Sequence, residues 1–460
     1  MDITFLGAAE RVTGSCYWLR AGESNVLLEC GMIQGGRKDE AKNAEPLPVR
    51  PGEIDAVVLS HAHIDHSGRL PLLRKQGYQG PIYTHLATRA LCSIMLSDSG
   101  YLQEKDAEWA NRKRQRRGKP LVEPLYTQAD GEAVIEQFRG LAYGERREIA
   151  PGISVRLRNA GHILGSAIVE VWLVEDGREC KLVFSGDLGF AGAPVMPDPE
   201  IIEDADVVLM ESTYGDRLHR PPDETLKELA DVFEAARGGN VIIPAFAVSR
   251  TQDLLCLLSE HYEAWGIDRY RIFLDSPMAI EATSTYAQFR HLYEAELFRP
   301  GSSIPRLPNL HMSRTSDESM AINTIDSGAI IIAASGMCTG GRVLHHLKHN
   351  LWKTGSHIVF VGFQAAGTLG RRLVDGAEHV RIFGEDIRVG ATIHTVGGLS
   401  AHADQDGLME WYGHFKGHPP LWLVHGEPDA QAALAKAINT KFGIDPGIAR
   451  LNECVSLPGR

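Results

Sequence analysis

The run His61-Ala62-His63-Ile64-Asp65-His66 constrains this chain more than any other feature. Four potential metal ligands lie within it, directly after the apolar stretch 54–59, which predicts a strand. A chain leaving a strand can present two imidazoles, spaced two residues apart, to one cation. Asp65 and His66 can then face a second cation. The run therefore predicts a metal site at a strand end.

Two further strand ends offer the ligands that such a site would still need. His162 lies between glycines in the stretch 161–165, and Asp187 follows the apolar stretch 182–184. They add a nitrogen ligand and a carboxylate that can bridge two cations. Because imidazole and carboxylate suit zinc, we expect zinc, with manganese or iron as alternatives.

Composition excludes several classes of protein. With 43% hydrophobic and 23% charged residues, the 460-residue chain has the composition of a folded globular protein with two or three domain-sized units. Its seven cysteines include no Cys-x-x-Cys pair, which disfavours a disulfide framework and a thiolate zinc site. The first residues carry an early acid and no long apolar run, so we expect a cytoplasmic protein without membrane contact.

The formal net charge of -12 disfavours non-specific attraction to a polyanion. Any contact with nucleic acid must therefore be local. One dense basic run lies at 112–119, and it is either a solvated helix end or such a local contact.

The periodicity of apolar residues changes along the chain. The first part predicts strands at 54–59, 153–157, 167–174 and 182–184 and helices at 86–114 and 129–139. From about residue 206, repeated strand-then-helix units predict a parallel sheet covered on both faces, with strands at 207–210, 241–246, 272–274, 330–334 and 357–361. Ser249 has the spacing of a capping box for the next helix. A last strand at 421–424 and a helix at 429–442 follow.

The metal-binding stretches resemble those of the metallo-β-lactamase superfamily. Two segments, 400–404 around His402 and 423–427 around His425, resemble the C-terminal histidine motifs of its β-CASP branch of nucleic-acid hydrolases. Glu211, in Met210-Glu211-Ser212-Thr213-Tyr214-Gly215, resembles the acidic motif of that branch. Further likeness at 244–248, 275–279, 335–342 and 362–371 extends the resemblance over nearly the whole chain.

The resemblance implies an α/β fold, a metallo-β-lactamase four-layer αββα sandwich with an inserted Rossmann-like βα domain, the β-CASP domain. The implied domains are residues 1–211 and 392–460 for the sandwich and 212–391 for the insertion.

The resemblance also assigns the site residues. It implies two Zn²⁺ per chain, one held by His61, His63 and His162, the other by Asp65, His66 and His425, with Asp187 bridging them. It implies His402, Glu211 and Asp65 as catalytic residues. One departure concerns Glu29, where the family usually shows aspartate; we expect Glu29 to orient a zinc-binding histidine and not to bind zinc itself.

The implied activity is zinc-dependent hydrolysis of RNA, with attack by a metal-bound hydroxide and His402, oriented by Glu211, as general acid. A histidine at 425 favours RNA over DNA within the branch. Glycine-rich loops can offer N–H groups and arginines to phosphates, and the residues expected to bind substrate are Ser335, Arg342, Thr368, Arg371 and Ser400. Endonuclease and 5′-to-3′ exonuclease modes are not separated.

Three other functions are alternatives. A small-molecule hydrolase of the superfamily would not need the long insertion or the Glu211, His402 and His425 set. An RNA-binding scaffold that had lost its metals is disfavoured because every expected ligand position is filled. A DNA nuclease stays open, since contacts to the 2′-hydroxyl decide sugar selectivity. The expected partner is RNA, and a homo-oligomer is open.

Overall fold

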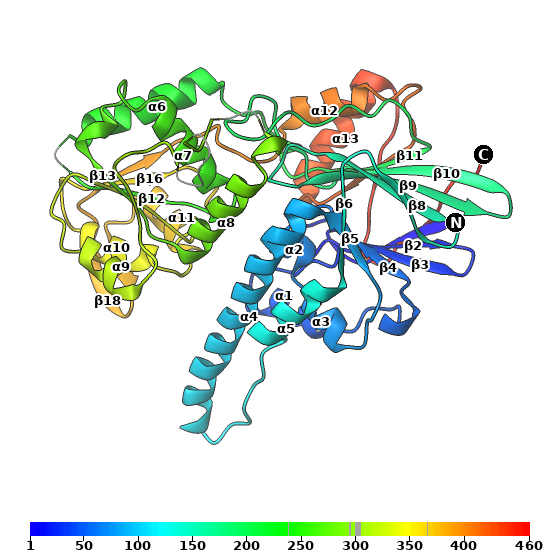
Figure 1. Ribbon diagram of the computed structural model, residues 1–460, viewed down its shortest axis with the longest axis horizontal. Coiled ribbons are helices and arrows are strands. Elements are labelled where there is room, and N and C mark those ends of the chain that lie inside the picture. Colours follow the sequence, from blue (N-terminus) through cyan, green and yellow to red (C-terminus); the bar gives the residue numbers. More distant parts are fainter. Residues whose placement is uncertain (238, 294–295, 300–304, 366) are drawn as a thin grey trace. The chain divides into compact units, whose positions relative to one another are not determined.

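The computed structural model describes residues 1–237, 239–293, 296–299, 305–365 and 367–460 (Figure 1). Ala366, within the predicted motif 362–371, lies outside them. The chain forms two compact units: the sandwich unit, residues 1–191, 198–218 and 402–460, and the inserted unit, residues 192–197 and 219–401. The domain boundaries expected at 212 and 391 stay a prediction. Among the described helices, none has the length and apolar character needed to cross a membrane.

The sandwich unit contains two seven-stranded sheets. The first has the order β22 (Cys454–Ser456), β1 (Asp2–Phe5), β2 (Tyr17–Ala21), β3 (Ser24–Leu28), β4 (Ala56–Val58), β5 (Ile82–His85) and β6 (Phe138–Leu141). The second has the order β21 (Gly447–Ile448), β20 (Leu421–Val424), β11 (Val207–Glu211), β10 (Arg178–Phe184), β9 (Ala167–Glu175), β8 (Ile153–Asn159) and β7 (Arg146–Ala150).

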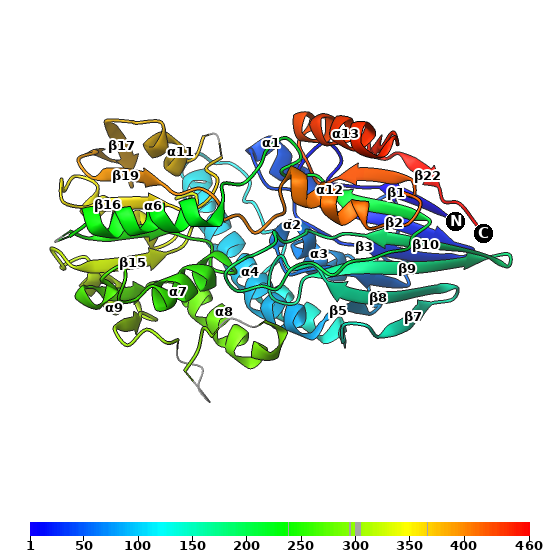
Figure 2. The same cartoon turned by 90° about the horizontal axis from the view of Figure 1, so that it is seen from above.

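The two sheets pack face to face because their strands alternate between buried and partly exposed side chains. Leu19 and Val26 from the first sheet and Val155 and Val169 from the second are fully buried in one apolar core. Helices cover the outer faces, above and below the two sheets in Figure 1, and Figure 2 shows the same layers from above. They are α1 (Arg37–Glu40), α2 (Ile64–Ser67), α3 (Leu70–Lys75), α4 (Leu86–Gln115), α5 (Gln128–Ala133), α12 (Gln405–Gly413) and α13 (Pro428–Phe442).

The inserted unit is built on a six-stranded sheet in which every pairing is parallel. Its order is β14 (Leu310–Met312), β13 (Arg271–Leu274), β15 (Ala329–Ala333), β12 (Val241–Pro244), β16 (His357–Phe360) and β19 (Thr392–Thr395). The central strands are buried along their length, as the continuous apolar runs predicted. Its helices are α6 (Pro222–Ala235), α7 (Arg250–Glu260), α8 (Pro277–Gln288), α9 (Ser316–Ile322), α10 (Val343–Asn350) and α11 (Leu369–Val374), and β17 (His379–Ile382) pairs with β18 (Glu385–Arg388).

Two local predictions are wrong. The helix expected at 129–139 ends at Ala133, and a 3-10 turn leads to strand β6, which begins at Phe138. Ser249 makes no capping bond, because its backbone has a φ of 68° and its hydroxyl instead donates to Asp253 at 3.5 Å. A side chain on left-handed backbone points away from the first turn of the helix, which sequence spacing does not reveal.

A buried carboxylate ties the elements of the inserted unit together. Asp275, at the end of β13, accepts hydrogen bonds from Arg342 at 2.6 Å, from His346 at 2.6 Å and from Ser319 at 2.6 Å. Burial alone would raise the pKa of Asp275, but these bonds hold it below its usual value. The ionised carboxylate therefore stabilises the inserted unit at neutral pH, and this contribution is lost as the pH falls below about 4.

We expect Asp275→Asn to destabilise the inserted unit by about 3 kcal/mol, because it removes a buried carboxylate charge and leaves the partly buried guanidinium of Arg342 without its counter-charge. Hydrogen exchange should quicken in β13 and β15 and stay unchanged in β8 to β10. The matched control is Asp375→Asn, since Asp375 pairs with Arg371 on the surface. Equal exchange in both variants would contradict the assigned role.

Candidate metal centre

The sheet topology brings separate strand ends to one edge. Strands β10, β11 and β20 are neighbours and run parallel, and β8 runs in the same direction because β9 is antiparallel to both β8 and β10. Their carboxyl ends carry Asp187, Glu211, His425 and His162. His61 follows β4 of the other sheet. Residues far apart in sequence therefore meet within the sandwich unit.

Three imidazoles form the first half of the cluster. Nδ1 of His63 lies 3.1 Å from Nε2 of His61 and 3.1 Å from Nε2 of His162. Tetrahedral zinc with nitrogen ligands at 2.0–2.1 Å requires ligand nitrogens about 3.3 Å apart. The three histidines thus have the spacing of one zinc site.

The second half consists of Asp65, His66 and His425. Nε2 of His66 lies 3.1 Å from Nε2 of His425, and a carboxylate oxygen of Asp65 lies 3.4 Å from the same His425 nitrogen. Asp65 and His66 reach this position because α2 begins immediately after the strand-end histidines.

Asp187 lies between the two halves. Its Oδ2 is 3.4 Å from Nε2 of His61 and 3.3 Å from Nε2 of His66. Both of its carboxylate oxygens are buried and make no hydrogen bond to any described residue. An ionised carboxylate in such a place is costly unless a cation compensates it. The residues therefore fit metal ions, and Asp187 fits a bridging ligand.

Burial sets the protonation of the first half. It lowers the pKa of His61 and brings the pKa of His63 to about 4, so both rings are neutral at pH 7. Burial raises the pKa of Asp65, but the charges of His66 and His425 outweigh it and bring the pKa to about 2. Neutral imidazoles and ionised carboxylates are the forms that bind zinc.

Three of these rings, those of His61, His66 and His425, are oriented by a hydrogen bond to Nδ1, the nitrogen that is not part of the close Nε2 contacts described above. Glu29 is fully buried, and its Oε2 lies 3.0 Å from Nδ1 of His66 while its Oε1 accepts the Ser60 N–H at 2.6 Å. The hydroxyl of Ser60 lies 3.0 Å from Nδ1 of His61, and that of Thr213 lies 3.0 Å from Nδ1 of His425. Sequence reasoning missed Ser60 and Thr213, although both lie within two residues of a predicted site residue.

Beside the cluster, His402 is held by Glu211. Nδ1 of His402 lies 3.1 and 3.2 Å from the two oxygens of Glu211, which is fully buried and accepts the Leu188 N–H at 2.7 Å. Burial alone would lower the pKa of His402, but the charge of Glu211 and its hydrogen bond, followed by Asp187, raise it to about 9. His402 is thus a cation at neutral pH, able to donate a proton.

The glycine-rich loops expected to bind phosphate lie together in the inserted unit. The Gly370 N–H donates to the Met337 carbonyl at 3.3 Å, and a Cβ at this position would lie 1.8 Å from Gln364 Oε1, so any other residue would displace the Gln364 side chain. Ser335 accepts two N–H groups of its own loop, and Thr368 caps α11.

The predicted arginines are already engaged within the protein. Arg342 donates to Asp275 and to the carbonyls of Ser313 and Arg314, while Arg371 pairs with Asp375 at 2.9 Å. Ser400 lies two residues before His402. Phosphate binding by these residues stays a prediction.

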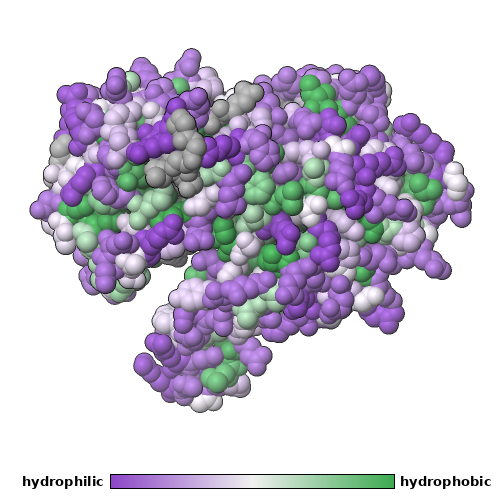
Figure 3. Space-filling view, in the orientation of Figure 1, coloured by the Kyte–Doolittle hydropathy of each residue, from purple (hydrophilic) through white to green (hydrophobic). Residues whose placement is uncertain are grey.

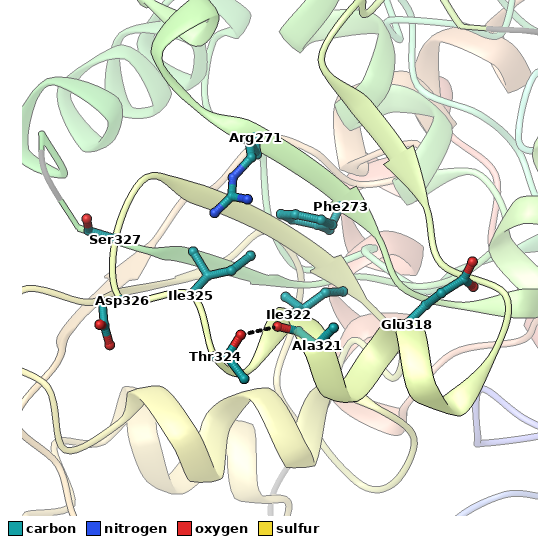
Figure 4. Close-up of a pocket in the computed structure, with 9 residues that line it drawn as sticks. All are labelled: Arg271, Phe273, Glu318, Ala321, Ile322, Thr324, Ile325, Asp326 and Ser327. Carbon is teal, nitrogen blue, oxygen red and sulfur yellow. Dashed lines mark hydrogen bonds between the residues drawn. The ribbon is translucent and has the colours of Figure 1, made fainter.

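A cavity of about 440 Å³ opens on the inserted unit (Figure 4). It holds none of the predicted site residues, and its lining is Arg271, Phe273, Glu318, Ala321, Ile322, Thr324, Ile325, Asp326 and Ser327.

Three family models match successive parts of the chain. The model of the metallo-beta-lactamase superfamily matches residues 9–241, and the Beta-Casp domain model matches residues 251–373. A model described as a Zn-dependent metallo-hydrolase RNA specificity domain matches residues 386–449.

Several known proteins are similar over nearly the whole chain. Ribonuclease TTHA0252 of Thermus thermophilus is 40% identical over 460 residues, covering 99% of this chain and 100% of that protein. Transcription termination factor FttA of Thermococcus kodakarensis is 36% identical, covering 96% of this chain and 69% of that protein. A solved protein of unknown function from Enterococcus faecalis shares the fold, with a TM-score of 0.54 at 14% identity and 99% coverage of both chains. The chain therefore belongs to the metallo-β-lactamase superfamily and carries a β-CASP domain, which confirms the resemblance and the fold expected from the sequence.

Proposed function

We propose that this protein is a zinc-dependent ribonuclease that hydrolyses RNA phosphodiester bonds. The observation that carries the proposal is the joining of the histidine–aspartate cluster to the Glu211–His402 pair in one site. His402 and His425 both fall within the region that matches the RNA specificity domain. A relative that is 40% identical and matched over its whole length is named a ribonuclease.

Two Zn²⁺ ions are the proposed cofactor. We propose that His61, His63 and His162 hold one ion, that Asp65, His66 and His425 hold the other, and that Asp187 binds both. Zinc held by these residues would supply Lewis-acid activation of a phosphoryl oxygen and a water of lowered pKa. The neutral rings of His61 and His63 each have a nitrogen lone pair available to bind a cation. Hydrogen bonds to Glu29 and Thr213 fix the orientation of the His66 and His425 rings.

His402 supplies the proton that the leaving sugar oxygen needs. Its side chain is 20% exposed at the edge of the buried cluster, where a substrate can reach it. Glu211 keeps the ring cationic and fixes its orientation through two oxygens. After transfer, the neutral imidazole regains a proton from solvent, so the acid is restored for each turnover.

RNA is the proposed substrate, with Ser335, Arg342, Thr368, Arg371 and Ser400 as candidate contacts. The division into residues 1–211, 212–391 and 392–460, the use of manganese in place of zinc, a homo-oligomer and a cytoplasmic location all stay predictions.

Cleavage of matched 5′-labelled RNA and DNA oligonucleotides by zinc-loaded protein tests this function. We expect about two zinc ions per chain by elemental analysis, cleavage of RNA in preference to DNA, and a loss of at least about hundredfold in kcat for His402→Ala. The control is His414→Ala, an exposed histidine of the same unit. Parent protein that cuts neither polymer, or a His402→Ala variant as fast as the parent, refutes the proposal.

The pH profile tests the Glu211–His402 pair separately. Because the protonated ring is the active form, we expect kcat to fall as the pH rises through about 9. Glu211→Gln removes the charge that raises this pKa, so the alkaline limb should move to lower pH. Glu410→Gln, an exposed change in the same unit, should leave the limb in place. If Glu211→Gln lowers kcat at every pH but leaves the alkaline limb at the same pH, Glu211 has a purely structural role.

Glu29→Gln tests the orientation of His66. Without the carboxylate charge, the outer nitrogen of His66 is held less firmly, and we expect the zinc Kd to rise about tenfold or more in competition with a chelator. Glu170→Gln is the matched control, since Glu170 on β9 is also buried but pairs with Arg156 of β8 and Lys181 of β10. Equal zinc affinity in the two folded variants would show that Glu29 does not tune the site.

A further inference from the structure

The second half of α4 and the segment after it form an arm, residues 101–122, that projects from the sandwich unit (Figure 1). The buried residues of α4 all lie at or before Gly100. The arm is held by its own contacts: Asn111 exchanges two hydrogen bonds of 2.9 Å with the backbone of Val122. Since no residue of α4 after Gly100 is fully buried, this half of the helix gains little from packing, and its surface calls for another explanation.

Positive charge is concentrated on this arm. Residues 101–119 hold seven lysines and arginines and three acids, in a chain with a net charge of -12. In the part of the chain that the structure describes, no ion pair involves Arg112, Lys113, Arg116, Arg117 or Lys119. Cations in the last turn of a helix offset its dipole, but Arg116, Arg117 and Lys119 lie beyond the helix end at Gln115.

Large apolar side chains lie between these charges. Trp109 is 58% exposed although the Lys113 ammonium covers its ring at 3.4 Å from the centroid, and Tyr101, Leu102, Leu121 and Val122 are also exposed. Figure 3 shows a hydrophobic patch near the tip of the arm among hydrophilic residues. Aromatic faces alternating with unpaired cations suit a flexible polyanion whose bases stack.

We propose that the arm binds single-stranded RNA and so holds long substrates at a distance from the metal centre. This rests on the proposed ribonuclease function. The base of the arm adjoins the cluster, because Thr88 donates to the Gly165 carbonyl at 2.6 Å, three residues after His162. From Thr88 to Arg112 the helix extends roughly 36 Å, the length of about ten stacked nucleotides. RNA shorter than this cannot occupy both the site and the basic end of the arm.

The test compares two variants with the same loss of charge. The arm variant is R112Q/R116Q/R117Q/K119Q. The control variant is R50Q/R147Q/R237Q/K416Q, which removes four exposed cations that are each paired with a glutamate elsewhere. Affinity for a labelled 30-nucleotide RNA is measured by fluorescence anisotropy in the His402→Ala background, and kcat/KM is measured on 30- and 6-nucleotide RNAs in the active protein.

We expect the arm variant to bind the 30-nucleotide RNA at least about tenfold more weakly and to lose about three units from the slope of log affinity against log salt. Trp109→Ala should weaken binding about tenfold. The control variant should keep the parent affinity. On the 6-nucleotide RNA, kcat/KM should be the same in the parent, the arm variant, the Trp109→Ala variant and the control variant.

Parent affinity in the arm variant, or an equal loss in the control, overturns the proposal. If the arm variant binds RNA like the parent but has a different sedimentation coefficient, the arm mediates contacts between copies of the chain. That result would also overturn the proposal. If the parent cuts neither RNA, the ribonuclease proposal fails, while the anisotropy still decides whether the arm binds RNA.

Discussion

The buried carboxylate of Asp187 is the constraint on which the site depends. Its Oδ2 lies 3.4 Å from Nε2 of His61 and 3.3 Å from Nε2 of His66, and neither carboxylate oxygen makes a hydrogen bond to a described residue. Desolvation of one charge in this position would cost several kcal/mol if no cation were present. Burial lowers the pKa of His61 and His63, so these two rings do not supply that positive charge, whereas at His66 burial is outweighed by nearby carboxylates, Asp187 first among them, which raise its pKa. Two cations bound at the cluster would compensate this carboxylate more fully than one protonated ring does, so the burial of Asp187 favours metal binding.

The inserted unit can be large because the chain leaves and re-enters the sandwich unit at neighbouring points. Tyr214, where the chain leaves the sandwich, forms a parallel bridge with Asp404, where it returns. The exit and the return therefore lie side by side, and β20 pairs with β11 as if the intervening residues were one loop. The entropic cost of closing a loop grows only slowly with the number of residues in the loop. Bringing His425 to Asp187 therefore costs little more entropy across the long insertion than it would across a short loop.

The sequence predicted those features that depend on local spacing or on strand ends. The His61–His66 run follows strand β4 and enters helix α2, as its spacing predicted, and the continuous apolar runs predicted the parallel sheet. Features that depend on tertiary position were missed. Ser249 has the spacing of a cap but a left-handed backbone, and the helix expected at 129–139 yields to β6 because pairing with β5 outweighs local propensity. Arg342 follows glycines, as a phosphate ligand would, yet the fold directs it to Asp275, more than sixty residues away in sequence.

Net charge is a poor guide to where a polyanion binds such a chain. Screening limits each surface charge to a range of about 8 to 10 Å in physiological salt. Residues 101–115 of α4 extend about 22 Å, so cations at the far end of the helix lie beyond the screened reach of most acids on the sandwich. The field that an approaching phosphate experiences there is that of the local lysines and arginines. An overall charge of -12 is thus compatible with one strongly attractive surface, provided that the surface stands away from the rest of the protein.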